Sequence, residues 1–116
     1  MDPASDAYEL LRIFIGERDN FEGKPLYQGL VELLRSKHFA GETVLRGISG
    51  FGASSKLHTD RFDMLSLDMP IVVECVEIVE NIEAVLPEIE QIVGGGLITR
   101  ENVRVLLPRP AAPPEP

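Results

Sequence analysis

The stretch that decides the fold reads Ile71-Val-Val-Glu-Cys-Val-Glu-Ile-Val79, and an amphipathic segment that ends in Gly94-Gly-Gly96 follows it at once. The first part is rich in β-branched residues, which favour strands. In the second part the apolar residues recur at the spacing of one helix face; they are Ile82, Val85, Leu86, Ile89, Ile92 and Val93. The sequence therefore predicts a strand and then a helix that begins near Glu80 or Asn81. Pro87 either kinks this helix or marks its true first turn.

The same pattern occurs toward the N-terminus. Residues 8–15 form a short run that is rich in β-branched and aromatic residues and that Gly16 closes, which predicts a strand. After a polar loop, Pro25 is well placed in the first turn of a helix that extends to about Phe39. Residues 43–51 and 97–107 return to strand-like character, although glycines interrupt the first of these two runs.

The order strand, helix, strand, strand, helix, strand predicts an α+β domain of ferredoxin-like topology. In this fold two helices cover one face of a four-stranded antiparallel sheet. The predicted domain occupies residues 8–107. We expect residues 1–7 to be a flexible N-terminus, and residues 108–116, which hold five of the nine prolines, to be an extended and mobile tail.

Both faces of the predicted first strand are apolar. Leu11, Ile13 and Ile15 point to one side, and Leu10 and Phe14 point to the other. A half-solvated antiparallel sheet normally alternates apolar with polar residues. The face that the helices leave bare is therefore expected to be covered, and the simplest cover is another copy of the chain.

Composition argues against several classes of function. The formal net charge of −8 and the even scatter of the 11 basic residues disfavour nucleic-acid binding. Cys75 is the single cysteine, so one chain offers neither a disulfide nor a thiolate zinc site, which fits a reducing cytoplasm. The N-terminus lacks the features of an export signal, and the apolar stretches are far shorter than the ~20 residues that cross a bilayer.

Gly50-Phe51-Gly52 ends the strand predicted for residues 43–51. Two interpretations stay open here: a turn or bulge that requires positive φ, and a close approach of the backbone to a ligand. The polar segment from Ala53 to Asp63 is long enough to act as a lid, with a plain solvated loop as the alternative. Its candidate contact residues are Ser54, Ser55, Lys56, His58, Thr59, Asp60 and Arg61.

Glycines and cations elsewhere are candidates for holding an anion. Gly94-Gly95-Gly96 is either a helix C-cap, for which one glycine is commonly enough, or a nest of N–H groups for a phosphate. A phosphate at a helix C-terminus needs nearby cations to overcome the helix dipole, and Arg100 and Arg104 are available. For Arg46 we favour an ion pair with a carboxylate over reach into a cleft between subunits.

Catalytic and metal chemistry have little support. Ser54, Ser55, His58 and Asp60 supply the residue types of a nucleophilic triad, but they crowd onto one loop. His58 and Asp60 alone fall short of a dedicated metal site. Cys75 is expected inside a buried strand, where thiols are inert. We therefore expect a protein that is not an enzyme and that has no structural metal and no obligatory cofactor.

In combination, these motifs resemble the PII family of signalling proteins. Gly-Phe-Gly at residues 50–52 is similar to the motif that precedes the long PII T-loop, and residues 94–96 are similar in position to the glycine-rich PII B-loop. Arg104 stands where PII has a phosphate-contacting arginine on its last strand, whereas the Asp and Lys of the PII B-loop are absent. The chain resembles still more closely a PII-like family of unassigned function, often associated with fluoride-export channel genes, through residues 12–17, 23–27, 44–48, 50–52 and 57–59.

The resemblance implies a cytoplasmic homotrimer that binds a small effector between its subunits. The implied effector is an adenine nucleotide (ADP, AMP or ATP), held by Arg46, Arg104 and the glycine motifs. A mobile loop would then regulate a partner protein such as a membrane transporter or channel. Two other classes stay open: a structural trimer of the ion-tolerance type that binds no nucleotide, and an amino-acid-binding regulatory domain.

Overall fold

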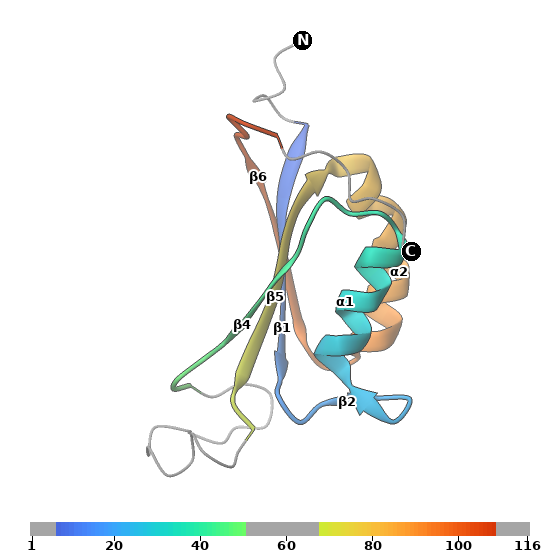
Figure 1. The fold of residues 1–116 in the computed structure, drawn as a ribbon, viewed down its shortest axis with the longest axis vertical. Coiled ribbons are helices and arrows are strands. Elements are labelled where there is room, and N and C mark those ends of the chain that lie inside the picture. Colours follow the sequence, from blue (N-terminus) through green and yellow to red (C-terminus); the bar gives the residue numbers. More distant parts are fainter. Residues whose placement is uncertain (1–6, 51–67, 109–116) are drawn as a thin grey trace.

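The computed structural model describes residues 7–50 and 68–108. One sheet contains β1 (Tyr8–Gly16), β4 (Thr43–Arg46), β5 (Pro70–Ile78) and β6 (Leu97–Val103). Helices α1 (Leu26–Ser36) and α2 (Val79–Val93) pack side by side on one face of this sheet (Figure 1). A short hairpin of β2 (Asn20–Phe21) and β3 (Lys24–Pro25) precedes α1.

The strand order is β4-β5-β1-β6, and every neighbouring pair is antiparallel. The two longest strands, β5 and β1, lie in the centre, where Ile13 is opposite Val73 on one side and Ile98 on the other. This arrangement confirms the predicted α+β fold of ferredoxin-like topology. The edges of the sheet are β4 and β6.

The core lies between the sheet and the two helices. Leu11, Ile13 and Ile15 of β1 are buried, as the alternation of the sequence predicted. They pack with buried residues of β5 and of both helices, which are Ile71, Val73, Cys75, Leu26, Leu30, Leu34, Ile82, Val85, Ile89 and Val93. Burying one such aliphatic side chain stabilises a fold by about 1.5–3 kcal/mol, so this layer is the main source of stability.

The face of the sheet away from the helices is the second apolar surface that the sequence predicted, and we call it the open face. Leu10 and Phe14 of β1 lie on this face, and the strand register shows which residues of the other three strands lie on the same face. These are Thr43 and Leu45 of β4, Val72, Glu74 and Val76 of β5, and Leu97, Thr99 and Glu101 of β6. Leu45, Val76 and Leu97 are 48%, 41% and 59% exposed.

Helix α1 ends earlier than predicted, because the chain leaves the helix through a Schellman motif. The Phe39 N–H donates to the Leu34 carbonyl at 3.2 Å, and the His38 N–H donates to the Arg35 carbonyl at 3.0 Å. His38 has φ 63°, a conformation that glycine usually supplies at this position. Phe39 then turns back into the core and is 2% exposed.

Other element boundaries differ from those predicted for physical reasons. Pro25 pairs with Asn20 in the hairpin, so the helix starts one residue later and the expected polar loop is partly strand. Val79 belongs to α2 and not to the strand, and Pro87 lies in the middle of α2, so the suggestion that it marks the first turn was wrong. The predicted strands at residues 43–51 and 97–107 end at Arg46 and Val103.

Several sequence predictions fall outside the described residues. They concern the N-terminus, the Pro-rich tail and the segment from Ala53 to Asp63 with its candidate contact residues. Phe51 and Gly52 of the Gly-Phe-Gly motif also fall there.

Candidate functional site

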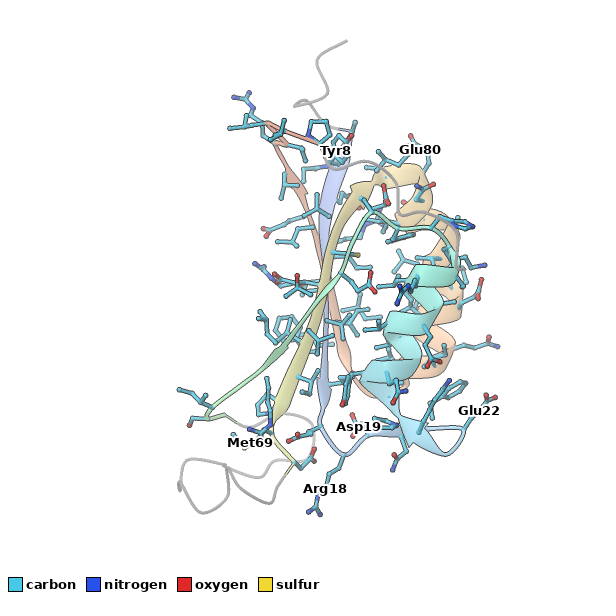
Figure 2. The ribbon with its side chains drawn as sticks, viewed as in Figure 1. Tyr8, Arg18, Asp19, Glu22, Met69 and Glu80 are labelled. Carbon is cyan, nitrogen blue, oxygen red and sulfur yellow. The ribbon has the colours of Figure 1, made fainter. Side chains whose placement is uncertain are left out.

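The candidate site residues gather mostly at one end of the sheet, which we call the loop end. It comprises residues 16–19, 46–50, 68–70 and 94–96, because the register sets Gly16 opposite Pro70 and Phe14 opposite Leu97. Figure 2 shows Arg18, Asp19 and Met69 at this end, and Tyr8 and Glu80 at the other. Among the candidates that the structure describes, Arg46, Gly50 and the three glycines at 94–96 lie at the loop end.

Gly50 has a local structural reason to be glycine. Its φ of 149° is one that L-residues rarely adopt, and a Cβ there would come within 3.2 Å of Pro70 Cγ. Gly47 also lies against Pro70, and its N–H donates to the Pro70 carbonyl at 2.7 Å. The turn interpretation of the first glycine of the motif is therefore supported, and it does not exclude a ligand beside the same backbone.

Two of the three glycines after α2 have structural roles. Gly94 caps the helix with φ 66°, and its N–H donates to the Glu90 carbonyl. Gly96 touches β1 so closely that a Cβ would lie 2.8 Å from the Phe14 carbonyl oxygen. A Cβ on Gly95 would meet nothing within 4 Å, and its φ is not in the left-handed range. Gly95 is thus the glycine that neither backbone strain nor packing explains.

Arg46 forms the ion pair that we favoured from the sequence. Its Nε lies 3.0 Å from Glu17 Oε1, and both carboxylate oxygens of Glu17 accept from it. Glu17 also accepts from the Met69 N–H, while its own N–H donates to the Met69 carbonyl at 2.8 Å. The Glu17 carboxylate therefore links the end of β1 to the start of β5 and to the end of β4.

Two aspartates complete this arrangement. Asp68 accepts from the Arg18 N–H at 2.9 Å, and Asp19 accepts from the Gly16 N–H at 2.9 Å. Gly16 makes room for Asp68, because a Cβ there would come within 2.7 Å of Asp68 Oδ1. Sequence reasoning missed Glu17, Asp19 and Asp68; the available signal was that these carboxylates lie close in sequence to the ends of predicted strands.

The two candidate cations, Arg100 on β6 and Arg104 just after it, differ in their surroundings. Arg100 Nε lies 2.8 Å from Glu9 Oε1, and its Nη2 lies 2.9 Å from Glu83 Oε1. The hydrogen bonds to Glu83 and Glu9 raise the pKa of Arg100 above its usual value. Arg100 is therefore engaged within the chain. Arg104 is exposed and makes no ion pair with any residue in the described ranges.

One chain does not bring all the candidates together. Arg46 and Gly50 lie on the β4 edge, and Gly94–Gly96 lie next to the β6 edge, with β5 and β1 between them. At about 4.8 Å per strand, the two edges are about 14 Å apart. Arg104 follows the far end of β6, whose Val103 is opposite Tyr8, and so lies a strand length away from the three glycines.

Two features of the described residues bear on metal and thiol chemistry. Within residues 7–50 and 68–108, no three His, Cys, Asp or Glu side chains form a group that could hold a metal ion. Burial raises the pKa of Cys75 to about 12, with smaller contributions from Glu77, Glu42 and Glu74. Neither α1 nor α2 has the length and apolar character to span a bilayer.

Comparison with known proteins gives sequence relatives along nearly the whole described region. Residues 8–105 match the model of the DUF190 family, described as "Uncharacterized ACR". A UPF0166 protein of Methanocaldococcus jannaschii is 37% identical over 91 residues, which cover 78% of this chain and 83% of the relative. A UPF0166 protein of Aquifex aeolicus is 39% identical over 98 residues, covering 84% and 92%.

Two solved structures share the fold. One is described as CPII bound to ADP and bicarbonate, from Thiomonas intermedia K12; it has a TM-score of 0.56 and 17% identity, over 84% of this chain and 87% of the other. The second is the divalent ion tolerance protein CutA1 of Ehrlichia chaffeensis, with a TM-score of 0.56 and 10% identity, over 84% and 82%. At these identities the likeness concerns the fold alone.

Proposed function

The chain belongs to the DUF190 family, and from this premise we propose that it is a PII-like signalling protein. In this proposal it is a homo-oligomeric sensor, not an enzyme, that binds a small effector between its subunits and regulates a partner protein. The observation that carries the proposal is the position of the candidate residues: Arg46 and Gly50 on one edge of the sheet, and Gly95 near the other, all at the loop end.

A cyclic assembly explains this division of the site. Homo-oligomers are mostly closed rings, and in a head-to-tail ring one edge of a subunit meets the opposite edge of the next. With the strands of all subunits pointing the same way, Gly95 of one copy meets the β4 end of its neighbour. Each site is then incomplete in one chain and complete in the assembly. Three copies, as the resemblance to PII implies, give three such sites.

An adenine nucleotide is the effector that we propose, with bicarbonate as a smaller anion to test beside it. The fold neighbour from Thiomonas intermedia K12 is bound to ADP and bicarbonate, which makes ADP the first ligand to examine. Gly95 supports a phosphate at this position, because it leaves its backbone open where no packing demands glycine. Arg104 is exposed and makes no ion pair within the described part of the chain, but it follows the far end of β6, a strand length from Gly95, so we do not include it in this site.

The test is a thermal and calorimetric titration of the full chain with ADP, AMP and ATP. A ligand at a hundred times its dissociation constant stabilises a site by about 2.7 kcal/mol, which gives a clear thermal shift. Gly95→Val should remove this shift and leave the fold intact, since the new side chain enters open space. Arg104→Ala is the control: Arg104 is exposed but lies a strand length from Gly95, so its loss should leave the thermal shift unchanged.

The fold likeness to CutA1 supports a second candidate, a structural trimer without a nucleotide site. Its TM-score equals that of the nucleotide-bound neighbour, so the fold by itself does not separate the two. If the chain is a structural trimer, adenine nucleotides at millimolar concentration should give no binding heat in calorimetry and no increase in thermal stability. That result would overturn the sensor proposal. The partner that we propose for the sensor, a membrane transporter or channel, would then lose its basis as well.

A further inference from the structure

The open face carries one group of charged residues in the middle of an apolar surface. Around it lie the partly exposed apolar side chains of the face, which are Leu10, Phe14, Leu45, Val72, Val76 and Leu97. Among the described residues, the large apolar side chains that are exposed lie on this face, on its edges or just beyond its strands, and not on α1 or α2. The sheet side is therefore the side that needs a cover.

The charged group is a network across three strands. Arg12 Nε of β1 lies 3.2 Å from Glu74 Oε2 of β5, and Arg12 Nη1 lies 3.3 Å from Glu101 Oε1 of β6. Arg12 and Glu74 are directly opposite in the register. Glu101 is opposite Leu10, two residues along β1, so it reaches Arg12 diagonally. The side chains of Arg12, Glu74 and Glu101 are 40%, 28% and 60% exposed.

The balance of charge in this network is negative. One arginine faces two glutamates, so one negative charge per chain is not compensated. The other described residues of the open face, from all four strands, are uncharged; Tyr8 and Thr43 are among the polar ones. Each network also keeps unused arginine N–H groups and unused carboxylate oxygens. An identical network can pair with both, so the occupant that fits is a second copy of this chain.

We infer that the Arg12–Glu74–Glu101 network is the element by which the open face recognises a second copy, and that its surplus carboxylate makes this association proton-linked. The inference rests on the self-association in the proposed function and adds the residues and the condition that control it. Covering the face removes an uncompensated negative charge from water, which is unfavourable. Uptake of one proton by a carboxyl group makes the network neutral.

The sign of the effect follows from this proton uptake. Because the associated state binds a proton that the separate chain releases, association strengthens as pH falls from neutral toward the carboxyl range. Linkage limits the effect to tenfold in the association constant per pH unit for each proton taken up. A substitution that removes the surplus charge should strengthen association at neutral pH and flatten its pH dependence.

The test measures subunit exchange between isotope-labelled and unlabelled full-length chains by native mass spectrometry, at about pH 8 and about pH 5.5. For the natural sequence we expect exchange to be at least tenfold faster at the higher pH. Glu101→Gln should exchange slowly at both pH values. Glu88→Gln is the matched control, because Glu88 is a similarly exposed carboxylate in a single ion pair, with Lys37 at 2.9 Å, on the helix layer. It should behave like the natural sequence.

The outcomes separate this inference from the proposed function. Oligomers whose exchange is equally fast at both pH values, or that respond alike to Glu101→Gln and Glu88→Gln, overturn the inference and leave the oligomeric sensor standing. A chain that is monomeric under all conditions overturns both. Nucleotide binding without any pH effect on exchange overturns the inference alone.

Discussion

A Cβ on Gly96 would lie 2.8 Å from the carbonyl oxygen of Phe14, a distance that real Cβ atoms essentially never show. Gly96→Ala should therefore push β6 away from β1 and lower the free energy of unfolding by about 1–3 kcal/mol, the usual cost of overpacking. Gly95→Ala is the control, because it points into open space. Urea unfolding of both variants checks this; equal stability of the two would contradict the close approach.

His38→Gly should stabilise the protein. The left-handed conformation of His38 costs an L-residue about 1–2 kcal/mol relative to glycine, and the Schellman motif requires that conformation. Part of this gain is offset by the greater freedom of glycine in the unfolded chain, so we expect a net gain of about 1 kcal/mol. His38→Ala retains the strain and should show no gain. A destabilised His38→Gly variant would mean that the imidazole makes an unrecognised contact.

The order of the elements could be predicted because each long element has a clear period. Alternation placed Leu11, Ile13 and Ile15 in the core, and helical spacing placed Ile82, Val85 and Ile89 there too. The boundaries were harder. The end of α1 depends on His38 in a left-handed conformation that glycine usually adopts, so the sequence contained no residue that predicts a helix end at this position.

The candidate site could be predicted only in its local parts. Gly50 and the glycines at 94–96 could be recognised because they interrupt or end regular elements. Arg46 could be recognised because it is a charged residue within a predicted strand, which indicated an ion pair. The partners of these residues could not, because Glu17 and Arg46 are 29 residues apart and meet only through the sheet. The network of Arg12, Glu74 and Glu101 also joins residues far apart in the sequence, and these residues meet only because the sheet register brings their three strands together.

Glu77→Ala should destabilise the fold by about 1–3 kcal/mol, the cost of leaving two partly buried N–H groups without an acceptor. Glu77 is 8% exposed; its Oε2 accepts from the Ala40 N–H at 3.3 Å, and its Oε1 accepts from the Ile78 N–H at 2.9 Å. Glu77→Gln keeps one oxygen acceptor and should lose less. Thermal unfolding of the three proteins checks the order, and a loss as large for Gln as for Ala would contradict this role.

Cys75 should be unreactive in the folded protein. Burial, followed by the charges of Glu77, Glu42 and Glu74, raises its pKa to about 12, so at about pH 8 only about one ten-thousandth of the thiol is thiolate. Labelling with Ellman's reagent should be slow in buffer and rapid after unfolding in urea. Rapid labelling of the folded protein at one thiol per chain would show that Cys75 is accessible and would reopen the question of thiol chemistry.

Glu42 gives the stability of the fold a dependence on pH that can be isolated. Burial, only partly offset by the charge of Arg35, raises the pKa of Glu42 above its ordinary 4.5. The folded state therefore holds the Glu42 proton more tightly than the unfolded state. The stability that Glu42 contributes is fully present below its unfolded-state pKa and is lost as pH rises through its raised folded-state pKa.

Glu42→Gln should remove that loss, so the free energy of unfolding of the variant, relative to that of the natural sequence, should increase as pH rises from about 4.5 to neutral. Glu90→Gln, which removes an exposed carboxylate from α2, should show no such trend. Chemical denaturation of the three proteins across this range checks the prediction, and a parallel pH dependence for the natural sequence and Glu42→Gln would contradict the effect of burial on Glu42.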